Sequence, residues 1–204
     1  MHQTSHTWRL VAKRLIQLKD DDLALRKTLI DNGELGEDYH PAMEALHNRN
    51  ADYLDEIIAT IGYPTIEKVG QEANDAAWLI IQHAIARPDF MRKCLGLLEE
   101  AVARKQADPK HLAYLSDRIA VYEGRAQRYG THFDWDENGK MSPRPFDDLA
   151  KVNQRRRSLG LNTLQEQTAI MRQQAKKENQ IPPKDLEIRR RKFLAWKRSV
   201  GWIP

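Results

Sequence analysis

The chain has 204 residues with a net charge of +4; 41% of its residues are hydrophobic, 30% are charged, and its mean hydropathy is −0.71. This composition is too apolar for a wholly disordered chain, and the single cysteine, Cys94, excludes an intramolecular disulfide framework and a cysteine-rich metal site. No apolar stretch reaches the length of about 18 residues that spans a bilayer, and the first residues lack the features of a signal peptide. We therefore expect a cytoplasmic protein with no membrane segment.

Apolar residues recur at the three- and four-residue spacing of amphipathic helices through most of the chain. Pro41 and Pro88 stand where proline opens a helix, and Gly62 stands where glycine ends one. The segment 72–86 is apolar on most sides, which predicts a central helix. The predicted helices cover residues 8–30, 41–61, 72–86, 88–102, 109–122, 147–158, 163–179 and 185–200.

One region departs from helical spacing. Residues 131–143 enclose Asn138-Gly139, the favoured centre of a type I′ turn, and this predicts a short β-hairpin. We therefore predict a mainly α fold, an irregular helical bundle with one hairpin. Its helical domain should cover residues 7–165, followed by a basic helical extension over residues 166–204.

The C-terminal part is strongly basic. Residues 151–204 carry 14 Lys or Arg and 4 Asp or Glu, a balance of +10, interleaved with Phe193, Trp196 and Trp202. The simplest interpretation is a solvated helix face with its aromatic side chains packed inward. Such a tail can also dock on the acidic remainder of the same protein or on a partner protein. Nucleic acid is a less favoured partner, because no recognised reading motif accompanies the charge.

Polar side chains stand in four predicted helices at positions where the spacing would place an apolar residue. Because buried polar groups are costly unless they are hydrogen-bonded, we expect these side chains to face one another in a polar pocket between helices. They are Asp22, His47, Asn50, Gln82, His83 and Asp117. Arg26, one turn after Asp22, can pair with it. The alternative is a hydrogen-bond network that only fixes how the helices pack.

Several of these residues fall in motifs that resemble an uncharacterised bacterial family of domains of unknown function. The likeness covers roughly residues 10–165, and Leu23 and His132 depart from it where the family would have glutamine. The matching motifs are Asp22…Arg26, His47-x-x-Asn50, Gly62-Tyr63-Pro64-Thr65, Gln82-His83, Ala113-Tyr114-Leu115-Ser116-Asp117-Arg118, Gln127-x-Tyr129-Gly130-Thr131 and Arg155-Arg156-x-x-x-Gly160-Leu161. The resemblance implies a shared domain and a shared site, and it carries no known activity.

The preferred hypothesis for function is a small acid–base enzyme. A histidine whose pKa lies near neutrality, placed beside a carboxylate, is the usual equipment for general acid–base catalysis. We expect His83, Asp117 and His47 to be the catalytic groups, acting on a small polar or anionic substrate or on a peptide. The substrate-binding candidates, which offer cations or orienting hydrogen bonds, are Arg26, Asn50, Gln82, Tyr114, Arg118, Gln127, Tyr129, Thr131 and Arg155.

Two alternatives stay open. The same pocket could belong to a non-catalytic module that binds a small ligand or a peptide. It could also hold a divalent metal ion, because Asp22, His47 and His83 have the ligand types of a two-histidine, one-carboxylate site. No cofactor is otherwise indicated by the sequence.

Overall fold

The computed structural model describes residues 2–36 and 38–204. The chain forms two compact units, Met1–Asp108 and Pro109–Pro204. Within the described residues both units are mainly helical, and a two-stranded antiparallel sheet lies in the second. The predicted mainly α fold with one hairpin is therefore confirmed.

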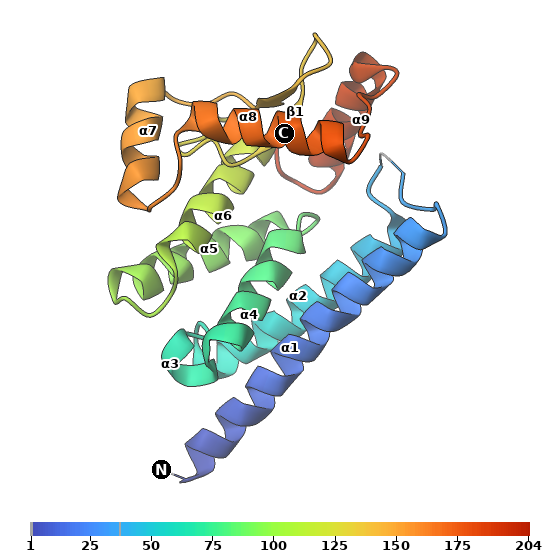
Figure 1. The fold of residues 1–204 in the computed structure, drawn as a ribbon. Helices are drawn as coiled ribbons and strands as arrows, with labels where there is room; N and C mark the ends of the chain where they lie inside the picture. Colours follow the sequence, from blue (N-terminus) through green and yellow to red (C-terminus); the bar gives the residue numbers. More distant parts are fainter. Residues whose placement is uncertain (1, 37) are drawn as a thin grey trace. The chain divides into compact units, whose positions relative to one another are not determined.

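The first unit is organised around α4 (Gln71–His83). This helix packs against α1 (His2–Asp31), α2 (Pro41–Ile61), α3 (Ile66–Val69) and α5 (Pro88–Ala103). Helices α1 and α2 lie side by side, and both contact α4 (Figure 1). The central position predicted for the apolar segment 72–86 is thus confirmed.

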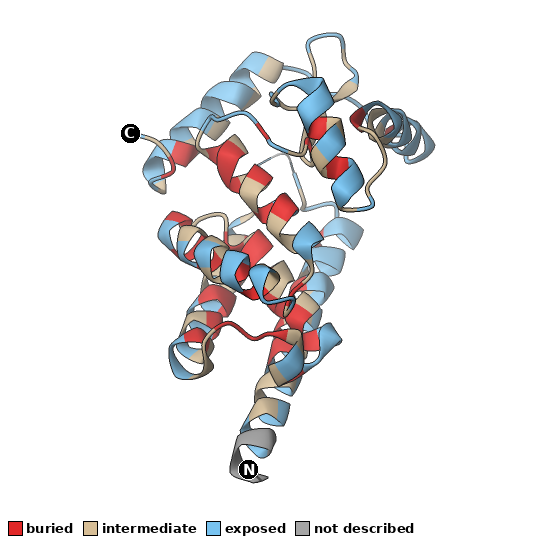
Figure 2. Cartoon of the chain, turned by 90° about the vertical axis from the view of Figure 1, so that its left-hand side faces the viewer, coloured by how far each residue is buried: buried red, intermediate tan, exposed pale blue. Residues whose placement is uncertain are grey.

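Small side chains explain how α4 approaches several helices at once. Ala73, Ala76 and Ala77 are at most 1% exposed, and short side chains at a helix contact permit a small distance between the axes. Figure 2 shows that buried residues interrupt the exposed ones along the helices of the chain. The helix ends at His83 instead of continuing to residue 86, because Ala84 leaves helical geometry at φ −74°, ψ 40°.

The ends of α2 follow from its sequence. His40 caps its start by accepting a hydrogen bond from the Ala42 N–H, and Pro41 occupies its first turn. At its end Gly62 adopts φ 71°, in the left-handed region that glycine enters without strain. These two ends place His47 in the second turn of α2, on the buried face.

The second unit contains four further helices and the hairpin. Helix α6 is buried along one side, and the hairpin strands pair in the register Phe133 with Pro143 and Trp135 with Met141. The elements are α6 (Pro109–Tyr122), β1 (Phe133–Trp135), β2 (Met141–Pro143), α7 (Leu149–Ser158), α8 (Leu164–Lys177) and α9 (Leu186–Ser199). Helix α8 packs against β2 and α7.

The hairpin turn differs from the expected type I′ turn. A type I′ turn needs positive φ at both central residues, yet among the described residues positive φ is found at Gly139 and not at Asn138. The Gly139 N–H donates to the Asp136 carbonyl, and the Asp136 N–H donates to the Lys140 carbonyl. This is a longer loop with glycine in the left-handed position, and the Asp136 carboxylate accepts from the Asn138 and Lys140 N–H groups.

The basic C-terminal segment packs within the second unit. Trp202 is 3% exposed and stacks on Tyr122 with ring centroids 5.1 Å apart. Phe193 lies 5.7 Å from the same tyrosine ring, and Arg189 forms an ion pair with Asp134 at 2.7 Å. The tail is therefore held by aromatic packing together with a few ion pairs.

A search of the described residues finds no helix with the length and hydropathy of a membrane span.

Candidate functional site

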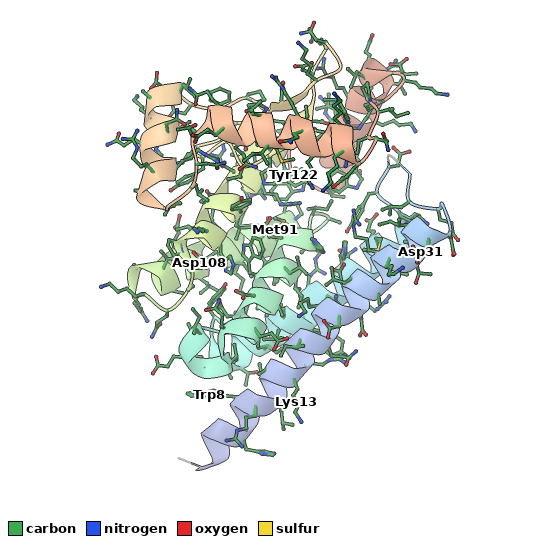
Figure 3. All side chains as sticks on the ribbon, viewed as in Figure 1. Trp8, Lys13, Asp31, Met91, Asp108 and Tyr122 are labelled. Carbon is green, nitrogen blue, oxygen red and sulfur yellow. The ribbon has the colours of Figure 1, made fainter. Side chains whose placement is uncertain are left out.

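Three helices of the first unit bring together one carboxylate and two imidazoles. Asp22 lies on the buried face of α1 and is 1% exposed, at a position where the helical spacing of Leu15, Leu18 and Leu29 would place an apolar side chain. His47 comes from α2, and His83 is the last residue of α4. In Figure 3, Lys13 and Asp31 mark the stretch of α1 that carries this aspartate.

The three side chains meet at short distances. Asp22 Oδ2 lies 2.7 Å from His83 Nδ1 and 3.2 Å from His47 Nε2. The ring centroids of the two histidines are 4.9 Å apart. One potential ligand atom from each of the three residues lies within 4.8 Å of the others. Of the six polar side chains expected to face one another, the structure brings Asp22, His47 and His83 together.

The hydrogen bonds within this cluster are incomplete. Among the described residues, Asp22 Oδ1 and His47 Nε2 are buried and have no hydrogen-bond partner. The 3.2 Å approach of His47 Nε2 to Asp22 Oδ2 is thus a close contact without hydrogen-bond geometry. Since a buried polar atom without a partner is costly, these two atoms mark a place where a ligand would be stabilised.

The electrostatics of the cluster keep Asp22 charged. Burial raises the pKa of this carboxyl, but the close polar contact with His47, the hydrogen bond with His83 and the charge interactions with both outweigh burial and hold the pKa well below its usual value. The site therefore contains an ionised carboxylate that is almost fully enclosed. Of the three side chains, that of His83 is the most exposed, at 25%.

Tyr39, which the sequence analysis missed, contacts both histidines. Its hydroxyl oxygen lies 2.6 Å from His47 Nδ1, and it donates a long hydrogen bond of 3.5 Å to the His83 carbonyl. Its ring stacks on the His47 ring at a centroid distance of 5.7 Å and an angle of 25°. Tyr39 lies in the non-helical segment between α1 and α2, where helical periodicity offers no signal.

The other polar residues predicted in this unit lie around the cluster with different roles. Asn50 donates from Nδ2 to the Leu18 carbonyl at 3.2 Å, which ties α2 to α1. Gln82 is 3% exposed, and its Nε2 has no hydrogen-bond partner among the described residues. Arg26 is exposed on α1. The expected pair between Asp22 and Arg26 is not formed among the described residues, because the two histidines occupy the carboxylate instead.

Asp117 lies in the second unit, where its carboxylate accepts hydrogen bonds from the loop of residues 128–131. Its Oδ1 accepts from the N–H of Arg128 at 2.7 Å, and its Oδ2 accepts from the N–H and the hydroxyl of Thr131, both at 3.0 Å. The Tyr129 N–H donates to both oxygens at 3.2 Å. Burial raises the pKa of Asp117, against the opposing effect of these donors. Its carboxylate oxygens are thus engaged by the backbone of residues 128–131.

The remaining predicted binding residues also belong to the second unit. Gln127 is fully buried, donates to the carbonyls of His132 and Arg144, and accepts from the His132 N–H. Arg155 donates to the Arg128 carbonyl and forms an ion pair with Asp147. Tyr114 is 36% exposed, and Arg118 is half-buried with an unpartnered Nε among the described residues.

Arg156 is a further buried cation that sequence reasoning did not single out. It is 2% exposed and donates to the Tyr129 carbonyl, to the Asn162 carbonyl and to the Asn162 side chain. Arg156 therefore helps to fix the segment 128–131, whose N–H groups donate to Asp117. Burial lowers the pKa of this guanidinium. Its place in the motif Arg155-Arg156 was the available signal.

Comparison with known proteins identifies the family. Neither a curated protein nor a solved structure matches the chain. The model of a family of unknown function, DUF6624, matches residues 10–177. The match covers most of the chain, confirms the resemblance inferred from the motifs, and extends beyond residue 165 to the last residue of α8. The chain therefore belongs to the family of unknown function DUF6624.

Proposed function

We propose that the first unit is a metal-dependent enzyme in which Asp22, His47 and His83 hold a divalent first-row transition-metal ion. The observation that carries this proposal is the convergence of the three ligand atoms within 4.8 Å, in a nearly enclosed site. Two imidazoles and one carboxylate form a ligand set used by zinc and by non-haem iron in enzymes.

The unpartnered atoms favour a metal ion over a simple hydrogen-bonded cluster. Asp22 Oδ1 and His47 Nε2 have no hydrogen-bond partner among the residues that the structure describes, and the other oxygen of the same ionised carboxylate, Oδ2, lies 3.2 Å from His47 Nε2. A cation placed among these atoms would satisfy both lone pairs at once and would offset the cost of burying the charge. His83 Nδ1 lies 2.7 Å from Asp22 Oδ2 and would supply the third ligand, the ion taking the place of the proton in this hydrogen bond.

The metal proposal explains more of the geometry than metal-free acid–base catalysis does. The 2.7 Å contact between Asp22 and His83 suits an aspartate that orients a catalytic imidazole. That arrangement leaves His47 Nε2 and Asp22 Oδ1 without a role. In addition, Asp117, the other carboxylate expected in such a mechanism, has its oxygens engaged by residues 128–131.

The arrangement suits hydrolytic chemistry on a small polar substrate. A divalent ion held by three protein ligands keeps positions open and lowers the pKa of a bound water toward neutrality. The side chains of Asp22 and His47 are 1% and 8% exposed, whereas that of His83 is 25% exposed, so we propose that substrate approaches past His83. Arg26, exposed one turn beyond Asp22, is the cation we propose for an anionic group of the substrate.

The test is metal binding by the full chain and by three variants. Protein stripped with a chelator is titrated with Zn²⁺ by calorimetry and with Co²⁺ by absorption spectroscopy. We expect one ion per chain in the wild type, and affinity at least about 100-fold lower in Asp22→Asn, His47→Gln and His83→Gln. His6→Gln is the matched control, because His6 is exposed on the same helix as Asp22.

A functional measurement accompanies the titration. Hydrolysis of p-nitrophenyl acetate and p-nitrophenyl phosphate is compared before and after metal is restored. The expected result is turnover that requires the metal and is lost in the three variants but kept in His6→Gln. Absence of stoichiometric metal binding in the wild type would overturn the proposal, as would equal binding by the three variants. Metal-free turnover that depends on His83 would support the acid–base hypothesis instead.

A further inference from the structure

Lys197 of α9 is a buried cation without an anionic partner. The residue is 7% exposed, and among the described residues its ammonium group forms neither a hydrogen bond nor an ion pair. The ammonium nitrogen lies 5.4 Å from the centroid of the Phe193 ring. Lysine is almost never buried in a protein unless its charge is paired. The surroundings of this ammonium group therefore point to a missing anion.

The Phe193 ring does not satisfy this ammonium group. An aromatic ring attracts a cation, but it offers no lone pair to the three N–H donors of a lysine. The same ring is also shared, because the guanidinium carbon of Arg144 lies 5.2 Å from its centroid. Burial, followed by the positive charges of Arg144 and Arg198, lowers the pKa of Lys197. The charged form of the lysine is thus destabilised by its neighbours.

The carboxylate of Asp134 is already engaged by two arginines. Its Oδ2 accepts a hydrogen bond from the Arg144 guanidinium, and its Oδ1 lies 2.7 Å from Arg189 Nη1. In the part of the chain that the structure describes, neither oxygen pairs with Lys197. These four side chains carry three positive charges and one negative charge. The group therefore has an excess of two positive charges.

The two cations at the Phe193 ring are held in place by the packing of the second unit. Arg144 directly follows β2, and its backbone N–H donates to the His132 carbonyl at 3.0 Å. Phe193 packs on Tyr122 of α6, which is labelled in Figure 3, with ring centroids 5.7 Å apart. Lys197 lies one helical turn after Phe193 on α9. Arg144 and Lys197 are thus brought together by the hairpin, α6 and α9.

We propose that Lys197 and Arg144 form a binding site for the phosphate group of a small molecule. A phosphate monoester carries close to two negative charges at neutral pH, which matches the excess charge of the group. Its oxygens accept hydrogen bonds from ammonium and guanidinium groups alike. The inference goes beyond the proposed function and is independent of it, because every residue involved lies in the second unit.

The first measurement is calorimetric titration of the full chain with phenyl phosphate and with inorganic phosphate at pH 7.5. The protein is stripped with a chelator beforehand, so that no metal ion contributes. We expect one phosphate per chain in the wild type. Affinity should fall at least about 10-fold in Lys197→Met and in Arg144→Gln, the loss typical of a hydrogen bond between charged groups. No binding in the wild type, or unchanged affinity in either variant, would overturn the proposal.

Lys184→Gln is the matched control for these titrations. Lys184 is an exposed lysine shortly before α9, and its substitution removes the same charge from the same unit. It should bind phosphate as the wild type does. An equal loss of affinity in Lys184→Gln and Lys197→Met would show that phosphate responds only to the net charge, which would refute a specific site.

The stability of Lys197→Met without phosphate tests whether the lysine lacks a partner. Methionine keeps a flexible, unbranched side chain without the charge. Because an unpaired buried charge is costly, this variant should melt at or above the wild-type temperature. A melting temperature more than about 4 °C below that of the wild type would show that the protein already stabilises the ammonium group, and it would overturn the inference.

Thermal melts with phosphate give a second measure of binding. At ten times the measured dissociation constant, phosphate should raise the melting temperature of the wild type and of Lys184→Gln by about 4 °C, and it should have no such effect on Lys197→Met. Phosphate also stabilises proteins in general by exclusion from their surface. An equal rise in all three proteins would therefore count against the site.

One further variant separates this site from the metal site of the proposed function. His83→Gln should bind phosphate as the wild type does, because His83 lies in the first unit. Loss of phosphate binding in His83→Gln would place the anion in the first unit and overturn the inference, while leaving the metal site intact. Tighter binding of phenyl phosphate than of inorganic phosphate supports the site with a phosphate monoester as its ligand, and equal binding supports it with phosphate itself.

Discussion

Asp117→Asn should destabilise the second unit without affecting metal binding by the first. The Asp117 carboxylate accepts hydrogen bonds from three backbone N–H groups, of Arg128, Tyr129 and Thr131, and from the Thr131 hydroxyl. Asparagine keeps the shape of the side chain, but it replaces one accepting oxygen by an NH₂ group that donates. The substitution therefore sets donors against donors at a residue that is fully buried.

The magnitude follows from the donors that lose an acceptor. If the amide nitrogen replaces Oδ1, the Arg128 N–H loses its partner; if it replaces Oδ2, the Thr131 N–H and hydroxyl lose theirs. A buried donor left without a partner costs about 1–3 kcal/mol. We expect the free energy of unfolding to fall by about 3 kcal/mol, which lowers the melting temperature of a chain of this length by about 9 °C.

Differential scanning calorimetry of the full chain measures this loss, and Zn²⁺ titration of the same samples measures the first unit. Asp185→Asn is the control, because Asp185 caps α9 by accepting from the Ile188 N–H and asparagine caps a helix equally well. A melting temperature within about 2 °C of the wild type would refute the reasoning. Loss of turnover at unchanged stability would instead support the catalytic role that the sequence suggested for Asp117.

Burial lowers the pKa of His132 to about 3, whereas its pKa in the unfolded chain is near 6.5. Between these two values the folded state binds fewer protons than the unfolded state. The free energy of unfolding is therefore highest above pH 6.5 and falls by about 2 kcal/mol by pH 5. Thermal melts at pH 7.5 and pH 5 should show a smaller fall in His132→Gln, and an equal fall would contradict this. Trp202→Ala should lower the free energy of unfolding in guanidinium by about 4 kcal/mol, and Arg189→Gln should lower it by less than about 1 kcal/mol. The reason is that buried aromatic packing contributes more than a partly exposed ion pair. The reverse order would show that ion pairs hold the tail. Burial raises the pKa of the Cys94 thiol to about 12, so a thiol reagent at pH 8 should react only after unfolding, and fast labelling of native protein would disprove this.

The helices were accessible to sequence analysis because their signals are local. A 3.6-residue spacing of apolar residues, together with Pro41 and Gly62 at the ends of α2, predicts where a helix begins and ends. The C-terminal end of α4 was placed three residues too far, since the apolar pattern continues beyond His83 while the backbone does not. The turn at Gly139 was assigned the wrong type because the Asp136 side chain organises a longer loop.

The same periodicity selected the residues of the candidate site. Asp22, His47 and His83 each stand where an apolar residue is expected, and this alone marks them as polar groups on the inward faces of their helices; Asp22 and His47 are buried and His83 is partly exposed. Asp117 had the same signal and has a different environment, enclosed by backbone N–H groups. Periodicity shows that a polar side chain is buried in the protein, and it does not show which groups surround it.

By itself, the sequence determined the mainly helical class, the position of the hairpin, the family and the inward-facing carboxylate and histidines, because each depends on residues close together in the chain. Only the tertiary structure decided the partners. It placed Asp22 against His47 and His83, and it brought Tyr39 from a segment without periodicity to the His47 ring. A hydrogen bond depends on distances of a few tenths of an ångström between atoms far apart in the sequence. Those distances are set by how whole helices pack, which no local pattern encodes.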